Sequence, residues 1–276
     1  MQFADLHTHT IYSDGVLTPE ELLVKALKCN LAAISITDHD AVEGCRIAIP
    51  LAKKFKLEFV TGIEFSCYED SKEYHILGYA FDIENEELNR QLVEFRKGRE
   101  LRAVKIVEKL KHLNVDIPFE FVLEKAGKAP IARPHIAEAL LERGYIKHRK
   151  EAFANYIGDG GPCYEPKLNF TVKKGIELIN DCGGVAVLAH PGTNIDSSTL
   201  FKFIKYGLDG IETIHPSHSA ALQKHYQSIA HQYWLLETGG SDFHGNRDYD
   251  EENFGKSVVP FSTVESINYH KRLTFE

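Results

Sequence analysis

The sequence predicts an α/β fold, in which a barrel-like domain with a mainly parallel sheet carries a small inserted helical domain. Short runs rich in apolar and β-branched residues alternate with helical patterns up to residue 84, and the alternation resumes after about residue 160. Between them, the pattern is helical and charged, without convincing strands. We therefore predict one barrel formed by residues 1–84 and 159–276, with residues 85–158 as the inserted helical domain.

The first part of the barrel is expected to contain two helices and four strands. The helix at residues 17–30 has a capping-box signature, in which Thr18 is the N-cap and Glu21 closes the box. The second helix, at residues 41–55, contains Pro50, which should bend or interrupt it. The four strands are expected at residues 2–9, 31–40, 57–68 and 72–81.

The inserted part and the rest of the barrel follow the same kind of pattern. Helices are expected at residues 86–115, 133–145 and 148–157, followed by a Gly/Pro loop at 158–167. The last strands of the barrel are expected within residues 183–191, 207–216 and 233–245, and residues 258–276 are expected to form a closing strand and a tail.

Composition restricts the function. The chain of 276 residues is 43% hydrophobic, which is enough for a real core, and its formal net charge is −8. An acidic chain is unsuited to binding duplex DNA through a broad basic surface, but it can still contain a local arginine pocket for a phosphate. Fourteen histidines are a high count for this length.

The cysteine pattern and the lack of targeting signals predict a cytoplasmic setting. The five cysteines are scattered, odd in number and without a CxxC pair, so a disulfide framework is not expected. No segment has the pattern of a signal peptide or a membrane span. We expect no membrane partner, and no obligate protein partner is evident.

Histidines and carboxylates follow the predicted strands. His7 and His9 are two residues apart at the end of a strand, so their side chains should share a face, and Asp14 lies in the next loop. Because the carboxyl ends of parallel strands meet at one rim of an α/β barrel, the other strand-end residues should join them. The full set of candidate ligands is His7, His9, Asp14, His39, Glu64, His75, His190, Asp242 and His244.

This set predicts a metal cluster. Any one of the histidines, for example His75, would more often be a hydrogen-bonded structural residue, but nine such residues at strand ends are hard to explain in that way. Six imidazoles and three carboxylates are too many for one ion. They suit two or three divalent metals in mixed nitrogen and oxygen coordination, such as Mn²⁺, Zn²⁺ or Fe²⁺.

These motifs resemble a known family. The segments DLHTHTIYSDG, ITDHD, GIEFS, HILGY, LAHP and GGSDFHG are similar to the ordered motifs of the polymerase and histidinol phosphatase (PHP) family, over residues 1–84 and about 160–260. The resemblance implies a distorted seven-stranded (β/α)7 barrel and a trinuclear metal site. It also implies three ligand sets: His7, His9, Glu64 and Asp242; Asp14, His39 and His244; and Glu64 with His75 and His190. Asp14 stands where many relatives have histidine, which favours Mn²⁺.

Arginines in the inserted part point to an anionic substrate. Arg99 is in phase with the apolar stripe of its helix, so it needs an anionic partner, either an acid of the barrel or a phosphate, unless its side chain extends out to solvent. Arg102 lies one turn further along the same flank. Arg133 begins a helix, where free N–H groups favour an anion, and His135 in its first turn either caps, packs or binds. Two groups of basic residues suggest a substrate with more than one phosphate.

The insert resembles one branch of the family, the bacterial proteins that act as 3′,5′-nucleotide bisphosphate phosphatases and 5′-to-3′ exoribonucleases. That resemblance implies that Arg99, Arg102, Arg133 and His135 bind substrate phosphates. The expected partner is a small phosphorylated nucleotide or a short single-stranded RNA.

The expected reaction is phosphoester hydrolysis, in which a hydroxide bridging two metals attacks phosphorus. Asp14, His39, Glu64 and Asp242 would act through the metals. One alternative is a phosphomonoesterase for a small metabolite such as histidinol phosphate; another is an inactive metal- or nucleotide-binding regulatory module. His215 and His218 could reach the rim, where the sequence leaves their role open.

Overall fold

The computed structural model describes residues 2–167, 169–193 and 195–273. The chain divides into two compact units, one formed by residues 1–89 and 170–276 and the other by residues 90–169. The division predicted from the sequence, with its boundaries after residues 84 and 158, stays a prediction.

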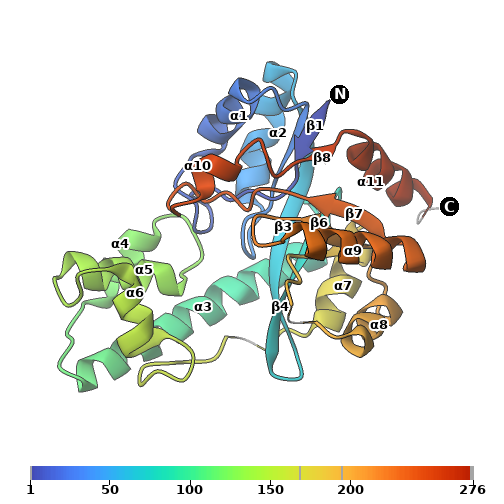
Figure 1. Ribbon diagram of the computed structural model, residues 1–276. Helices are drawn as coiled ribbons and strands as arrows, with labels where there is room; N and C mark the ends of the chain where they lie inside the picture. Colours follow the sequence, from blue (N-terminus) through green and yellow to red (C-terminus); the bar gives the residue numbers. More distant parts are fainter. Residues whose placement is uncertain (1, 168, 194, 274–276) are drawn as a thin grey trace. The chain divides into compact units, whose positions relative to one another are not determined.

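The first unit is built on one sheet with the spatial order β7-β6-β5-β4-β3-β2-β1-β8 (Figure 1). The strands are β1 (Phe3–Asp5), β2 (Ala33–Ile36), β3 (Glu58–Glu69), β4 (Lys72–Tyr79), β5 (Val185–Leu188), β6 (Gly210–Ile214), β7 (Leu236–Gly239) and β8 (Val259–Pro260). Beyond the strands, the Leu6 amide donates to the Gly239 carbonyl over 3.2 Å, and Thr8 and Phe243 form a parallel bridge. The segments that follow β1 and β7 are therefore joined, and the sheet forms a nearly closed barrel. The predicted α/β barrel class is confirmed.

Strand β4 departs from the parallel arrangement. It pairs antiparallel with both β3 and β5, whereas β1–β2, β2–β3, β5–β6 and β6–β7 are parallel. A two-residue turn, Asp70–Ser71, joins β3 to β4, and both residues have positive φ, as tight hairpin turns require. The reversal is one distortion of the barrel, and it lets a residue in the middle of β4, His75, lie at the same rim as the strand ends.

Helices of the first unit follow the predicted pattern. They are α1 (Pro19–Lys28), α2 (Glu43–Phe55), α7 (Val172–Asp181), α8 (Ser197–Lys205), α9 (Ala220–Tyr233), α10 (Asp250–Asn253) and α11 (Ser262–Leu273). The capping box between Thr18 and Glu21 is present. Pro50 does not interrupt α2, which runs through it; Pro50 lies on the exposed side, where the carbonyl that loses its helical donor can meet water. The predicted closing strand is present as β8, and α11 lies within the part predicted to be a tail; residues 274–276 lie outside the described residues.

The second unit is helical. The long helix α3 (Glu86–His112) runs from the first unit into it, and α4 (Phe119–Ala126), α5 (Arg133–Glu142), α6 (Arg149–Ala152) and a π-helical turn (Phe153–Ile157) follow. Its own core includes the fully buried side chains of Leu110, Val122 and Leu140. Among the described residues, no helix combines the length and the apolar character needed to cross a membrane.

Gly62 gives a test of how tightly β2 and β3 pack. A Cβ atom at this position would collide with the Ser35 hydroxyl and lie 2.5 Å from the Ile36 carbonyl oxygen. We expect Gly62→Ala to lower the free energy of unfolding by about 1–3 kcal/mol, measured by urea denaturation. In a Ser35→Ala background only part of this loss should disappear, because the Ile36 carbonyl belongs to the backbone of β2. Full recovery would contradict the packing described here.

Candidate metal centre

Two paired loops bring the first ligands together. Strand β1 ends at Asp5, earlier than predicted, so His7 and His9 lie in the segment that follows it. The His9 amide donates to the Phe243 carbonyl over 2.9 Å, and the Val16 amide donates to the His244 carbonyl over 2.8 Å. The loop after β1 and the loop after β7 are thus held side by side at one end of the sheet.

Glu64 of β3 is the centre of the cluster. One carboxylate oxygen, Oε1, lies 2.7 Å from His75 Nδ1 and 3.0 Å from His190 Nε2. The other, Oε2, lies 3.2–3.3 Å from nitrogens of three further histidines, His7, His9 and His39. The side chain is only 1% exposed. A single buried carboxylate is therefore surrounded by five imidazoles.

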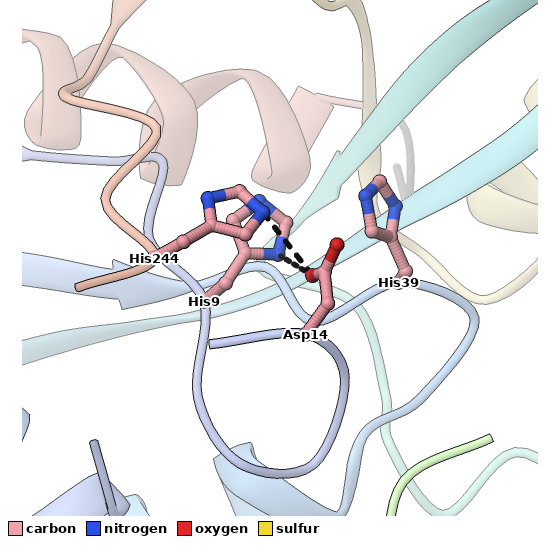
Figure 2. Close-up of side chains that lie close together, drawn as sticks. All are labelled: His9, Asp14, His39 and His244. Atoms are coloured by element: carbon pink, nitrogen blue, oxygen red, sulfur yellow. Dashed lines mark ion pairs between the residues drawn. The ribbon is translucent and has the colours of Figure 1, made fainter. Parts of the chain in front are cut away.

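A second group gathers around Asp14, as Figure 2 shows. Asp14 Oδ1 lies 3.1 Å from His244 Nε2 and 3.8 Å from His9 Nδ1, and His39 faces the same space. The rings of His9 and His244 stack with their centroids 4.1 Å apart. His9 and Asp14 come from the loop after β1, His39 from the loop after β2 and His244 from the loop after β7 (Figure 2).

The structure brings together all nine residues predicted as metal ligands. Within the described residues, three sets each place their ligand atoms within 4.8 Å of one another. The sets are His7, His9, Glu64 and Asp242; His9, Asp14, His39 and His244; and His39, Glu64 and His75. His190 reaches the cluster through its contact with Glu64. Whether each residue binds metal stays a prediction.

The donor atoms fit metal ions better than they fit each other. Five buried atoms lie close to atoms of opposite character and yet form no hydrogen bond in the structure: His7 Nε2, His9 Nε2, Asp14 Oδ1, His39 Nδ1 and Glu64 Oε2. Leaving buried polar atoms unsatisfied is costly unless another partner is intended. Imidazole and carboxylate donors that face a common space suit divalent metal ions.

Nearby histidines lower the pKa values of the three carboxylates in the cluster. Burial alone would raise the pKa of Glu64, but the surrounding histidines, His39, His75 and His7, outweigh burial and hold that pKa well below its usual range. The same balance holds the pKa values of Asp14 and Asp242 well below theirs. Burial lowers the pKa of His39 to about 3, so this imidazole is neutral at pH 7. All three carboxylates are therefore ionised, and His39 has a free lone pair.

The pKa values of His9 and His7 are raised, whereas that of His39 is lowered. Burial opposes the charged form of His9, but Asp242 and Glu64 outweigh it and raise the pKa to about 9. Burial likewise opposes charging of His7, and Glu212, Glu64 and Asp242 raise its pKa well above the usual value. In the metal-free protein, protons on these rings balance the buried carboxylates. A metal ion would have to replace those protons.

Glu212, on β6, is a functional residue that the sequence analysis missed. Its Oε1 lies 2.9 Å from His7 Nδ1, and its Oε2 accepts a 2.7 Å hydrogen bond from the His190 backbone amide. The contact with Nδ1 directs His7 Nε2 toward Glu64 and Asp242, and a carboxylate behind a ligating histidine fixes its orientation in this way. The signal in the sequence was weak: one acidic residue within the apolar strand GIETI.

Other buried acids hold the loops. Asp38 accepts hydrogen bonds from the Thr10 amide and hydroxyl and from the Ser13 hydroxyl, over 2.6–2.7 Å. Asp250 Oδ2 accepts hydrogen bonds from three backbone amides of one loop, those of His244, Asn246 and Arg247, over 3.0–3.3 Å. These carboxylates shape the backbone that carries Asp14 and His244.

The two further histidines have different roles. Both nitrogens of His218 contact backbone: Nδ1 lies 3.1 Å from the Thr213 carbonyl, and Nε2 accepts from the Gly192 amide over 3.2 Å, so this ring is structural. His215 Nε2 lies 3.4 Å from Asp242 Oδ2. His215 also lines a cavity of about 210 Å³ beside the cluster. The cavity is lined by His39, Glu64, His75, His190, His215, Ser217, Asp242 and Arg247.

The predicted substrate residues all lie in the second unit. Arg99 and Arg102 of α3 are mostly buried, with exposed fractions of 9% and 8%, and Arg102 Nε donates to the Glu165 carbonyl over 2.8 Å. Arg133 begins α5 and forms an ion pair with Asp159 at 2.6 Å. His135 Nδ1 accepts from the Ala132 amide over 3.1 Å, so it caps the same helix. Their binding role stays a prediction.

The fold and the cluster define a class of protein, the α/β barrels with a cluster of histidine and carboxylate side chains suited to metal ions at one rim. Comparison with known proteins identifies the family: the model of the PHP domain matches residues 5–151, and the chain belongs to this family. The 5′-3′ exoribonuclease Rnm of Salmonella typhimurium is 32% identical over 251 residues, which cover 87% of this chain and 84% of the relative. The 3′,5′-nucleoside bisphosphate phosphatase of Chromobacterium violaceum is 31% identical over 254 residues, which cover 88% of this chain and 89% of the relative.

A solved structure extends the likeness over the whole chain. The crystal structure of a metal-dependent phosphoesterase from Bifidobacterium adolescentis matches with a TM-score of 0.88 and 30% identity. It covers 96% of this chain and 95% of that one. The likeness therefore includes both units.

The role of Glu212 can be tested by measuring metal affinity. We expect Glu212→Gln to weaken Mn²⁺ binding by about 10- to 100-fold, because the amide holds the His7 imidazole less firmly in the required orientation. Competition with a fluorescent chelator measures the affinity. The control is Glu237→Gln, whose partner His231 is largely exposed, and it should leave the affinity unchanged. Equal affinities for the wild type and Glu212→Gln would contradict the orienting role.

The pKa of His9 predicts a pH dependence of metal binding. With a pKa of about 9 in the metal-free protein, this ring is protonated at pH 7 and must lose its proton before it can ligate. Metal affinity should therefore rise with pH from 6 to about 9, and binding at pH 7 should release protons. Calorimetry in two buffers of different ionisation enthalpy measures the release. Binding at pH 7 without proton release would show that His9 is not a ligand.

Proposed function

We propose that the protein is a metal-dependent phosphoesterase that acts on small phosphorylated nucleotides. It hydrolyses the 3′-phosphate of nucleoside 3′,5′-bisphosphates, or removes nucleotides from the 5′ end of short 5′-phosphorylated RNA, or both. The observation that carries the proposal is the cluster around Glu64, in which candidate ligands from six loops and strands gather and five of their buried atoms form no hydrogen bond. The names of the two relatives support the choice of substrate.

The proposed cofactor is two or three divalent ions, with Mn²⁺ favoured by the oxygen donors of Asp14, Glu64 and Asp242. Such ions neutralise charge on phosphate oxygens and make a nucleophile available from water near neutral pH. The chain itself holds the carboxylates ionised and His39 neutral. The proposed ligands are His7, His9, Asp14, His39, Glu64, His75, His190, Asp242 and His244.

Substrate phosphates are proposed to bind the basic residues of the second unit. Arg99 and Arg102 are mostly buried guanidinium groups, which suit bidentate recognition of a phosphate. Arg133 pairs with Asp159, whose side chain is 78% exposed, so water can solvate that carboxylate when its partner is taken by another anion. A phosphate at the start of α5 can therefore replace Asp159 at little cost. His135, which caps that helix, would keep its first turn in place.

The net charge of the chain supports the proposed size of the ligand. A chain of net charge −8 suits a short ligand bound in a local site rather than a long nucleic acid held on a broad basic surface. A small nucleotide or a short single strand is the proposed partner, and the cytoplasm is the proposed compartment.

Substrate preference can be measured directly. Mn²⁺-loaded protein is given adenosine 3′,5′-bisphosphate, a 5′-phosphorylated RNA trimer, the unphosphorylated trimer and histidinol phosphate, and product release is followed. We expect turnover of the first two, and a loss of about 10- to 100-fold in kcat/KM for Arg99→Ala, because one charged hydrogen-bonding partner is removed. Arg149→Ala, an exposed arginine paired with Glu138 in the same unit, is the matched control and should keep full activity.

Each alternative gives a different result in this assay. Turnover of histidinol phosphate alone would keep the barrel chemistry and contradict the proposed role of the second unit. No turnover of any of the four substrates by the metal-loaded protein would favour a regulatory binding module.

A further inference from the structure

Arg247 is a cation within the candidate metal centre to which the function described above gives no role. It follows β7 in the loop that carries Asp242 and His244, and its backbone amide is held by Asp250. Its Nη1 atom donates to Asp242 Oδ2 over 2.7 Å and lies 3.2 Å from the Tyr249 hydroxyl. Its Nη2 atom lies 2.9 Å from His244 Nε2. Arg247 also lines the 210 Å³ cavity beside the cluster.

The contacts of His244 fix which of its nitrogens carries the proton. Nδ1 lies 2.8 Å from the Asp242 carbonyl oxygen, which can only accept a hydrogen bond. Nδ1 therefore carries a proton, and in the neutral ring Nε2 is then the atom with the lone pair. A guanidinium has donors and no acceptor, so Arg247 Nη2 donates to that lone pair.

This hydrogen bond and metal binding exclude each other. An imidazole nitrogen has a single lone pair, so Nε2 cannot accept from Arg247 and ligate a metal at the same time. Nε2 is also the atom that lies 3.1 Å from Asp14 Oδ1, in the set formed with His9 and His39. A metal held by that set must break the contact between Nη2 and His244.

The second contact of Arg247 can survive metal binding. Asp242 faces His7 and His9 with Oδ1, at 3.4 and 3.1 Å, and faces Arg247 with Oδ2. Oδ1 can therefore serve a metal while Oδ2 keeps Nη1. The guanidinium would stay attached at one end, with the donors of its other end released next to the cavity.

We infer that Arg247 is a phosphate-binding residue that becomes available only when metal displaces it from His244. Without metal, Arg247 contacts Asp242 Oδ2 and His244 Nε2. When a metal takes His244 Nε2, the N–H groups of Arg247 that are released bind a phosphoryl oxygen in the cavity. Arginine is suited to this because its planar set of N–H groups matches a phosphate. The inference rests on the proposed phosphoesterase function.

Two affinities test it, and neither depends on turnover. Mn²⁺ affinity is measured by chelator competition, and the affinity of the Mn²⁺-loaded protein for inorganic phosphate is measured by calorimetry. We expect Arg247→Gln to bind Mn²⁺ about tenfold more tightly, since a competing cation is lost, and phosphate at least about tenfold more weakly, since a charged donor is lost. Arg247→Lys, which keeps the charge and loses the planar fork, should fall between the wild type and Arg247→Gln in both measurements.

Controls separate competition at His244 from a general effect of charge. Arg46→Gln removes a partly exposed arginine of the same unit that contacts Glu84, Ile83 and Asn89, and it should change neither affinity. In a His244→Ala background, most of the gain in Mn²⁺ affinity from Arg247→Gln should disappear. Circular dichroism establishes that each variant folds.

Two results would overturn the inference. One is phosphate affinity within twofold of the wild type in Arg247→Gln; the other is weaker Mn²⁺ binding in that variant. Failure of the proposed function would look different, because the effects of Arg247 on both affinities would remain while no nucleotide substrate was hydrolysed.

Discussion

The buried carboxylate of Glu64 is the constraint on which the rest of the candidate site depends. A charge that is 1% exposed is strongly destabilising unless cations or hydrogen bonds compensate it. Five imidazoles surround it, and the neighbouring carboxylates raise the pKa values of His7 and His9, which favours the positively charged forms of these rings. Metal ions would supply the same positive charge at the same atoms. The cluster is thus a place where positive charge is required, and protons and metals compete to provide it.

The barrel topology decides which residues can reach Glu64. His7, His39 and His190 follow strands β1, β2 and β5, which run in the same direction as one another, so their side chains meet at one rim. His75 reaches the site differently, because its strand, β4, pairs antiparallel with β3. His75 lies opposite Ser66, which is two positions from Glu64 and so on the same face of β3. The hairpin that distorts the barrel therefore also completes the site.

The sequence predicted which residues gather around Glu64 better than it predicted the groups that support them. His7 with His9, and Asp242 with His244, stand out because polar residues end apolar runs, a pattern visible without any structure. Glu212 gives no such signal, because its importance depends on its contacts with His7 and His190, which lie 205 and 22 positions away in the sequence. The same holds in the second unit, where helix periodicity placed Arg133 at the start of α5, but its pairing with Asp159 depends on a distant loop. Local patterns predict elements and strand ends, whereas pairing across the fold decides which polar atoms are satisfied.

That distinction separates two kinds of buried acid in this protein. Asp38 and Glu212 accept hydrogen bonds with both carboxylate oxygens, from backbone amides, hydroxyls or imidazole, so much of their capacity as acceptors is already used. Glu64 and Asp14 each keep a buried oxygen that lies near histidine nitrogens without accepting a hydrogen bond from them. Both groups consist of acidic residues; they differ in whether each oxygen near a histidine nitrogen accepts a hydrogen bond. The hydrogen bonds of Asp38 and Glu212 fix the loops around the cluster. The oxygens of Glu64 and Asp14 are thereby held in positions where a metal ion or a proton can bind them.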